Sequence, residues 1–491
     1  MTNQDVVLGI DSSTQSTKTI AWSRDGEALC EGRADIPMSQ PAAGRAEQDV
    51  EDWWNSTCVA TRAVTGQIDP ARIAGIAISN QRETVGFLDA EGRGSRPAMV
   101  WLDERASDEI ALLTTELGAE QLHKTTGKPA DITPVIYRLS WLNRHHPEDL
   151  KKISKIVDVH AFLSGRLTGR TVASWTSADP FGIFDIENKK WVESYLDHLN
   201  LSSEQFGEIA APGALISTIS QDAASETGLM AGTPVYAAGG DGQCAGLGVN
   251  AVRSGVVYLN LGTAIITGAW SKEPAISNYW RTMTSPSGDG YFVEGVQRAG
   301  AFFVNWFVDT FCGGREDPKV FDRLEALASQ IPIGAEGLVI CPYLTGCMDP
   351  HWDPNARANF IGLGPMHTQG HLYRAALEAL TLEIARSIVA MKANGIDAER
   401  IVAVGGGANS ALWSKMIADA TGLPLTKSKS LEASALGAGI SAAVGAGWYP
   451  SFDEAAIAMS SEGATINPDP SVAGLWAELS ERQAAAYIPS T

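Results

Sequence analysis

Apolar runs separated by short polar turns dominate the first hundred residues. Runs at residues 6–10 and 17–22 flank one polar turn, and Asp25-Gly26 then leads into a third run at 28–36. An Asp-Gly pair between apolar runs is typical of a tight hairpin, so we expect three strands here. Residues 49–66 begin with acidic side chains and carry apolar ones at helical spacing, which predicts a helix. Strands followed by a helix predict an α/β fold with a mixed sheet.

A second unit with the same pattern begins near residue 255. Asn260-x-x-Thr263 has the same spacing as Asp11-x-x-Thr14, and each pair follows an apolar run and precedes one that ends in Ala-Trp-Ser. Two such units, one opening each half of the chain, indicate a duplicated domain. The sequence therefore predicts two α/β domains with a cleft between them.

The boundary between the domains is expected in the Ala- and Gly-rich residues 239–250, which we interpret as a turn region. We therefore divide the chain into residues 1–247 and 248–491. The second half is more helical than the first. Residues 368–394 place their apolar side chains on one stripe, which predicts a long helix packed on a core.

Composition and charge restrict the classes of partner. The 491 residues include 37 Lys and Arg against 57 Asp and Glu, a formal net charge of −20. This field repels phosphate and argues against non-specific binding to nucleic acid or to anionic lipid. The six cysteines form no Cys-x-x-Cys pair, which argues against a zinc site and a disulfide scaffold. The amino terminus lacks the features of a signal peptide, and the most apolar stretch, 433–446, is too short to span a bilayer. We expect a soluble cytoplasmic protein.

Two loops have the composition of phosphate-binding turns. Residues 11–18 place small and hydroxylated side chains between two strands, where backbone N–H groups and hydroxyls suit phosphate oxygens. Asp11 could hold Mg²⁺ through water, and Lys18 could offset phosphate charge. The alternative is a Ser- and Thr-rich hairpin loop, and the related turn at 261–264 favours function because two opposed hydroxyl loops can grip a polyphosphate.

A glycine run follows the predicted strand at 400–404. Gly405-Gly406-Gly407 permits close approach of the backbone to a flat ligand at the start of the predicted helix 410–420. The alternative is a simple strand-to-helix turn, which rarely needs three glycines in a row. Gly437-x-Gly439-x-x-Ala442 matches a dinucleotide fingerprint only weakly, and we interpret it as close helix packing.

Polar residues at two strand ends could bind and activate a hydroxyl compound. Residues 79–84 end a strand with six polar side chains, including an adjacent Arg and Glu, and Trp101 and Asp103 follow soon after. The alternatives are a solvated turn and a core tryptophan. Asp241 lies among three glycines after an apolar run, a position that suits a general base accepting a hydroxyl proton. The alternative there is an acidic turn.

Taken together, these segments resemble the FGGY family of carbohydrate kinases over nearly the whole chain. The residues from Gly9 to Lys18 look like the first phosphate loop of that family, and 405–424 look like its second motif, on the adenine side. The resemblance implies two actin-like (ribonuclease H-like) ATPase domains with an interdomain cleft, and ATP and Mg²⁺ as cofactors. It implies nucleotide and phosphate contacts at Asp11, Ser13, Thr14, Gln15, Lys18, Gly262, Thr263, Gly300, Gly406, Gly407, Ala408 and Asn409. It also implies substrate contacts at Gln81, Arg82, Glu83, Trp101, Asp103, Asp241 and Gln243, with Asp241 catalytic.

The acceptor expected from the resemblance is a small sugar or polyol. Residues 44–54 and 350–357 look like xylulose kinases, whereas 80–84 look like glycerol kinases. Gly242 stands where those groups usually carry Asn or Gln, and we expect the missing side chain to leave space for five carbons. We therefore expect a ketopentose such as D-xylulose. The alternatives are a glycerol- or erythritol-type polyol kinase and, from another class, an actin-like nucleotide-switch ATPase without a small acceptor. A homodimer is one option for the oligomeric state.

Overall fold

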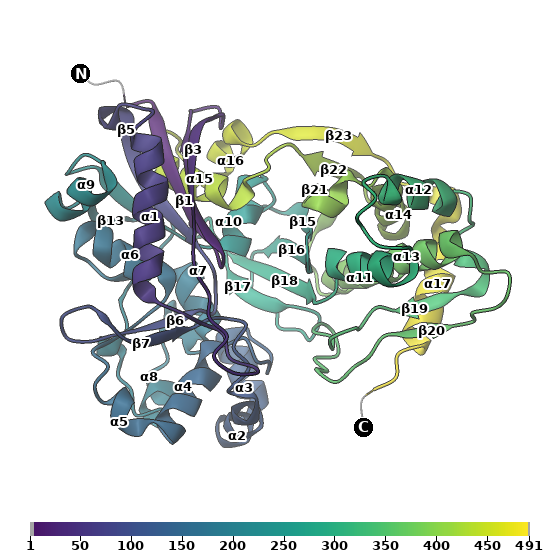
Figure 1. Ribbon diagram of the computed structural model, residues 1–491, viewed down its shortest axis with the longest axis horizontal. Coiled ribbons are helices and arrows are strands. Elements are labelled where there is room, and N and C mark those ends of the chain that lie inside the picture. Colours follow the sequence, from purple (N-terminus) through teal and green to yellow (C-terminus); the bar gives the residue numbers. More distant parts are fainter. Residues whose placement is uncertain (1–3, 490–491) are drawn as a thin grey trace.

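Two lobes, each built on a mixed β-sheet, make up the molecule (Figure 1). The computed structural model describes residues 4–489. The first sheet has the order β13-β14-β5-β1-β2-β3. Its strands are β1 (Val6–Ser12), β2 (Ser16–Trp22), β3 (Ala28–Asp35), β5 (Ile73–Asn80), β13 (Leu215–Thr218) and β14 (Pro234–Gly240). The predicted strands at 6–10, 17–22 and 28–36 are therefore confirmed.

The second sheet repeats the topology of the first. Its order is β17-β18-β16-β15-β21-β22-β23. β15 runs antiparallel to β16 and parallel to β21, just as β1 runs antiparallel to β2 and parallel to β5. The predicted duplication is confirmed. The strands are β15 (Gly255–Leu261), β16 (Ile265–Ser271), β17 (Arg281–Thr284), β18 (Tyr291–Gln297), β21 (Ala398–Val404), β22 (Leu425–Ser428) and β23 (Glu462–Ile466).

Helices pack on both sheets where the apolar periodicity predicts them. α1 (Val50–Thr65) begins after Asp49, whose side chain accepts a hydrogen bond of 3.0 Å from the backbone N–H of Glu51. α13 (Gln369–Ala393) and α14 (Ala411–Thr421) cover the second sheet and also agree with the prediction. No helix among residues 4–489 combines the length and the apolar content needed to cross a membrane.

Smaller elements complete the two lobes. Strands β4, β7, β6 and β8 form a separate four-stranded sheet, and three two-stranded sheets pair β10 with β11, β12 with β9, and β19 with β20. These strands are β4 (Glu47–Gln48), β6 (Val85–Leu88), β7 (Gly94–Met99), β8 (Lys155–Val157), β9 (Val172–Ser174), β10 (Phe184–Asp185), β11 (Lys190–Trp191), β12 (Glu208–Ala210), β19 (Val339–Cys341) and β20 (Asn359–Ile361). The remaining longer helices are α2 (Ser107–Leu117), α3 (Ala119–Thr126), α4 (Val135–His145), α6 (Val159–Thr168), α11 (Ala301–Phe311), α12 (Val320–Ala328), α16 (Phe452–Met459) and α17 (Ala473–Ala485).

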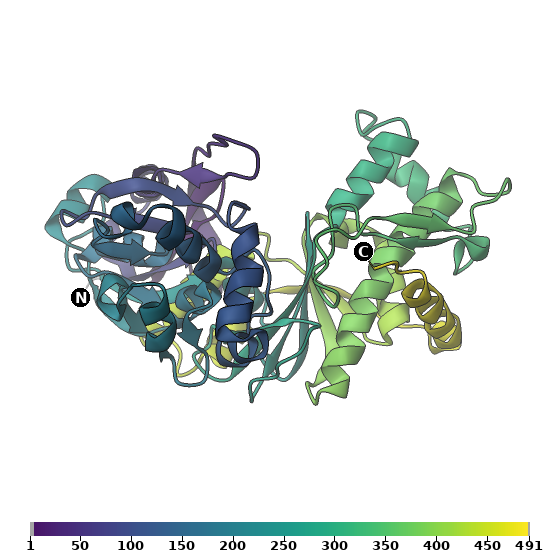
Figure 2. The ribbon, with the colours of Figure 1, turned by 90° about the horizontal axis from the view of Figure 1, so that it is seen from below.

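The junction between the lobes is helical, so the expected turn region at 239–250 is wrong. Asp241–Gly248 forms α10, which packs against α15 (Ala433–Gly445) from the end of the chain. Figure 2 shows the yellow ribbon of α15 reaching the purple and blue lobe, where it packs on β1 and β5. A Cβ at Gly248 would lie 2.0 Å from the carbonyl oxygen of Ala433, and one at Gly437 would lie 1.9 Å from that of Cys244. The glycines therefore serve helix contact, as predicted for 437–442, and the division at 247/248 stays a proposal.

Candidate active site

Both halves of the chain line a cavity of about 300 Å³ at the ends of β1, β14 and β15. The prediction of a cleft between two domains agrees with this placement. The first half contributes Asp11, Ser13, Thr14, Arg82, Glu83, Trp101, Thr133, Asp241, Gly242 and Ala245. The second half contributes Tyr258, Asn260, Ala264, Ile266, Arg281, Val296, Met348 and Ser434.

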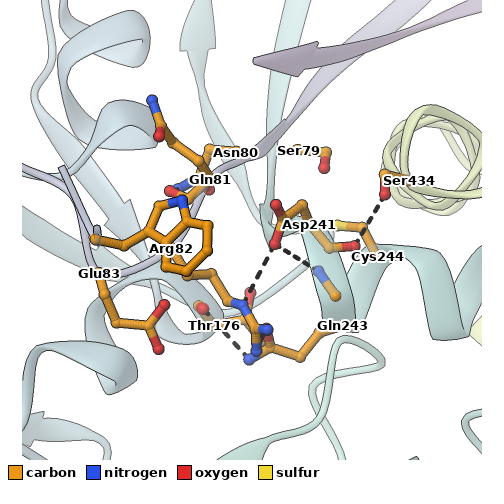
Figure 3. Close-up of polar contacts among 12 residues, drawn as sticks. Ser79, Asn80, Gln81, Arg82, Glu83, Thr176, Asp241, Gln243, Cys244 and Ser434 are labelled. Carbon is orange, nitrogen blue, oxygen red and sulfur yellow. Dashed lines mark hydrogen bonds and ion pairs between the residues drawn. The ribbon is translucent and has the colours of Figure 1, made fainter. Parts of the chain in front are cut away.

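Asp241 is the first residue of α10, so its side chain lies at the positive end of a helix dipole. One carboxylate oxygen accepts a hydrogen bond of 2.7 Å from the N–H of Gly242 and lies 3.3 Å from Nε of Arg82. Figure 3 shows the carboxylate between Arg82 and the helix that carries Ser434. The side chain is 34% exposed. Desolvation by the surrounding protein raises its pKa, although Arg82 opposes the shift. A carboxylate with a raised pKa facing a cavity can accept a proton.

Asp11, at the end of β1, faces the same cavity as Asp241. Ser79 donates a hydrogen bond of 2.9 Å to Asp11. Burial, and then the negative charge of Asp241, raise the pKa of Asp11 to about 7. A divalent cation beside Asp11 would relieve the repulsion between this carboxylate, Asp241 and phosphate oxygens, so Asp11 fits the expected role of holding Mg²⁺ through water. Within residues 4–489 no three or more His, Cys, Asp or Glu side chains form a metal-binding group, so phosphate and water would have to complete the coordination.

The first phosphate loop only partly faces the cavity. Ser13 and Thr14 line it, and the indole N–H of Trp101 donates a hydrogen bond of 2.9 Å to the Thr14 hydroxyl. Gln15 is exposed, and its carbonyl accepts a hydrogen bond from Ile36. Lys18 forms an ion pair with Glu432, just before α15. The structure thus brings Asp11, Ser13 and Thr14 together and ties Lys18 to the other half of the chain.

The second loop and the glycine run lie side by side. A Cβ at Gly405 would lie 2.7 Å from Oδ1 of Asn260, and one at Gly407 would lie 2.9 Å from Cβ of Leu261. Ala264, the last residue of the second loop (261–264), lines the cavity. The other residues expected to contact the nucleotide lie outside the cavity lining: Gly262, Thr263, Gly300, Gly406, Gly407, Ala408 and Asn409.

Local contacts explain several of these positions. The N–H of Gly300 donates a hydrogen bond of 3.0 Å to the carbonyl of Thr263, which fastens the second loop to the start of α11. Lys427 binds the side chain of Asn409. A Cβ at Gly406 would meet no atom within 4 Å, so open space lies beside the glycine run.

Of the residues expected to contact the acceptor, four line the cavity: Arg82, Glu83, Trp101 and Asp241. Trp101 is 39% exposed, which makes it a wall of the cavity rather than a core residue. Glu83 adopts the left-handed backbone conformation, with φ of 52°. Arg138 is fully buried and donates hydrogen bonds of 2.6 Å to the carbonyls of Glu83, Val100 and Thr133. These bonds hold the backbone of Glu83 and Thr133, two residues that line the cavity.

The other three residues expected there lie behind the wall. Asp103 is fully buried, binds Arg105, and accepts a hydrogen bond of 2.8 Å from the N–H of Ala46. Gln81 donates a hydrogen bond of 2.9 Å to Gln48. Gln243 accepts a hydrogen bond of 3.2 Å from Arg82 and does not line the cavity, so it supports Arg82 instead of facing the acceptor.

The space expected beside Gly242 is filled, so this part of the size argument is wrong. A Cβ at Gly242 would lie 2.8 Å from Nη2 of Arg82 and 3.0 Å from Oε2 of Glu294. Gly242 therefore makes room for an ion pair of the protein rather than for extra carbons of an acceptor.

Sequence reasoning missed two charged residues of the second half, Arg281 on β17 and Glu294 on β18. Arg281 lies 2.7 Å from Glu83, and Glu294 lies 3.0 Å from Arg82. One available signal was a charged side chain within the apolar run 291–296. The acceptor side of the cavity is therefore built by both halves of the chain.

Comparisons with known proteins agree over nearly the whole chain. The N-terminal domain of the FGGY family of carbohydrate kinases matches residues 6–248, and the C-terminal domain of that family matches residues 257–446. The chain is similar to the xylulose kinase of Bacillus subtilis (strain 168), with 28% identity over 466 residues, which cover 94% of this chain and 92% of that protein.

Two solved structures extend this likeness to the fold. The crystal structure of xylulose kinase from Rhodospirillum rubrum has a TM-score of 0.93 and 27% identity, and the match covers 98% of each chain. That of gluconate kinase from Lactobacillus acidophilus also has a TM-score of 0.93, with 25% identity over 98% of this chain and 97% of that chain.

Proposed function

Because the chain belongs to the FGGY family of carbohydrate kinases, it is a sugar kinase with two actin-like, ribonuclease H-like domains, and we propose that its acceptor is a ketopentose such as D-xylulose. The reaction would transfer the γ-phosphate of ATP to a primary hydroxyl of the sugar. One observation carries this proposal: Asp241 lines the same cavity as Asp11, Ser13 and Thr14 from the first phosphate loop and as Arg82 and Glu83 from the expected acceptor site.

Asp241 is the general base in this mechanism. Its carboxylate accepts the proton of the attacking hydroxyl while the oxygen of that hydroxyl forms a bond to the γ-phosphorus and the bond to the leaving ADP oxygen breaks. Arg82 and the N–H of Gly242 hold the carboxylate in place. Phosphoryl transfer depends mainly on positioning and electrostatics, so polar loops from two domains suffice.

The phosphate groups would lie against the turn that carries Ser13 and Thr14. Their hydroxyls and the backbone N–H groups of the turn supply donors to phosphate oxygens. Thr263 would approach from the second loop, and Lys18 would exchange Glu432 for phosphate. Asp11 would hold Mg²⁺ through water, and the bound ion would neutralise phosphate charge.

The choice of acceptor rests on the relatives and on the polar cavity wall. A ketopentose is favoured because the xylulose kinase of Bacillus subtilis matches 94% of the chain. A glycerol- or erythritol-type polyol is the second candidate, because Arg82 and Glu294 fill the space beside Gly242 that argued for a longer acceptor.

We expect D-xylulose to give the highest kcat/KM in a panel with D-gluconate, erythritol and glycerol. Glu83→Ala should lower the value for the best acceptor by about 10-fold or more, because buried polar groups that lose a partner penalise binding. The exposed Glu104→Ala is the control and should change little. If erythritol or glycerol gives the highest kcat/KM, the ketopentose assignment is contradicted.

The adenine is expected in the open space beside Gly406. Gly406→Leu should raise the KM for ATP by at least about tenfold, which corresponds to roughly 1.4 kcal/mol, because the side chain would occupy that space. A Cβ at Gly474 also meets no atom within 4 Å, so Gly474→Leu is the matched control and should leave that KM unchanged. Equal KM values for Gly406→Leu and the parent would place the adenine elsewhere.

A further inference from the structure

Glu294 is a fully buried carboxylate that binds two arginines at once. It lies on β18 and accepts hydrogen bonds of 3.0 Å from Nη1 and Nη2 of Arg82. Nη2 of Arg281, on the neighbouring strand β17, donates a third, of 2.5 Å. These two guanidinium groups lower the pKa of Glu294 to about 2, so it is an anion throughout the physiological range.

The two arginines each continue to a carboxylate at the cavity. Nε of Arg82 lies 3.3 Å from Asp241, and Nη1 of Arg281 donates a hydrogen bond of 2.7 Å to Glu83. The charges therefore alternate from Asp241 through Arg82, Glu294 and Arg281 to Glu83. The chain of ion pairs links the general base to the acceptor-binding carboxylate through two strands of the other domain.

Most N–H groups of Arg82 already have protein partners, so few remain to bind an acceptor. A guanidinium has five N–H groups. Those of Arg82 face Asp241, Gln243 and both oxygens of Glu294, so protein partners occupy most of them. Glu83 differs, since its Oε2 has no hydrogen-bond partner within residues 4–489 and the residue lines the cavity. Arg82 is thus suited to hold the base, and Glu83 to bind an acceptor hydroxyl.

The strand that carries Arg281 is fixed against the first half of the chain. The N–H of Thr282 donates a hydrogen bond of 2.8 Å to the carbonyl of Gly127, and Nζ of Lys128 donates one of 2.8 Å to that of Thr282. Asp179 accepts a hydrogen bond of 2.5 Å from the N–H of Thr284. These hydrogen bonds join β17, which carries Arg281, directly to the first half of the chain.

We propose that Glu294 and Arg281 are positioning residues of the acceptor site, and that Glu294 holds Arg82 against Asp241 and Arg281 against Glu83. This inference rests on the proposed function, in which Asp241 is the base and Glu83 binds the acceptor. Glu294 acts on both catalysis and binding, because both arginines depend on it. Arg281 acts on acceptor binding, because its second partner is Glu83.

Two variants separate these roles. Glu294→Gln keeps the size of the side chain and removes its charge, so both arginines lose their common anion. It should raise the KM for the acceptor and lower kcat, each by about tenfold, and leave the KM for ATP within about twofold. Arg281→Lys cannot bind Glu83 and Glu294 together, so it should raise the acceptor KM by about tenfold with kcat within about threefold.

The different kinetic effects of the two variants provide a readout that a merely structural role would not change. Glu294 contacts both arginines, so its replacement should change kcat and the acceptor KM together, whereas Arg281 contacts Glu83, so its replacement should change the acceptor KM with little effect on kcat. A general loosening of the fold would not separate kcat from the acceptor KM in this way.

Val293→Ala is the matched control. Val293 is the neighbour of Glu294 on β18, is fully buried in a separate apolar cluster, and does not line the cavity. Its truncation tests loss of packing in the hairpin, and it should leave both KM values and kcat unchanged. Thermal unfolding of each variant reports whether it is folded. If Glu294→Gln does not fold, Arg281→Lys alone decides.

The inference is overturned if a folded Glu294→Gln keeps parental acceptor KM and kcat, or if Arg281→Lys leaves the acceptor KM unchanged. It is also overturned if Val293→Ala reproduces the kinetic changes. If the parent enzyme phosphorylates no member of the acceptor panel, the proposed function fails instead, so the two failures are distinguishable.

Discussion

Asp241→Asn is expected to lower kcat on the best acceptor by about 10²–10⁴-fold, because an amide cannot accept the proton of the attacking hydroxyl. The substitution keeps the shape of the side chain, and its carbonyl oxygen can still accept the hydrogen bond from the N–H of Gly242. The KM for ATP and the unfolding temperature should therefore stay near those of the parent.

The control for this prediction is Asp108→Asn. Asp108 is an exposed aspartate in the first turn of α2, as Asp241 is in the first turn of α10. Steady-state kinetics and thermal unfolding of both variants check the prediction. A kcat for Asp241→Asn within about threefold of the parent would remove Asp241 from the role of base.

The second large effect is expected where α10 meets α15. Gly437→Ala would place a Cβ 1.9 Å from the carbonyl oxygen of Cys244, in backbone that cannot rotate away. The helices must then separate, and we expect the free energy of unfolding to fall by roughly 1–3 kcal/mol or more. Because α10 begins with Asp241, kcat should fall as well.

Denaturant unfolding measures this effect against Gly474→Ala. Gly474 lies in α17, and a Cβ there meets no atom within 4 Å. In a helix, glycine is less favourable than alanine by about 0.5–1 kcal/mol, so the control should keep or raise stability. Opposite signs for the two variants are expected. A stable, fully active Gly437→Ala would show that the close contact of the helices is not needed.

Local sequence patterns were sufficient for most of the fold and for the residues next to strand ends. The strands β1 and β2 and the helix α13 follow from apolar periodicity, because nearly all of their residues are buried. The largely exposed strand β3 follows from the Asp25-Gly26 turn that precedes it. The duplication followed from the equal spacing of Asp11 with Thr14 and of Asn260 with Thr263. Periodicity and turn chemistry are local properties, and a single chain displays them.

Contacts between distant segments could not be read from the sequence. Arg82 and Glu294 are 212 residues apart, so no local pattern shows that they pair. The same pair fills the space at Gly242, where a missing side chain had indicated room for substrate. The prediction that Asp103 contacts the acceptor is wrong for a related reason: Arg105 and the N–H of Ala46 bind its carboxylate, and Asp103 does not line the cavity. The glycines of α10 predict a turn, whereas in the structure they allow close contact with α15.

A crystal structure of the enzyme with D-xylulose and a non-hydrolysable ATP analogue tests the central claim most directly. The quantity to measure is the distance between a carboxylate oxygen of Asp241 and the nearest primary hydroxyl oxygen of the sugar. The account predicts about 2.6–3.2 Å, the reach of a general base, with the γ-phosphate beside Ser13 and Thr14. A sugar bound with every primary hydroxyl beyond hydrogen-bond reach of Asp241, or bound outside the cavity, would contradict it.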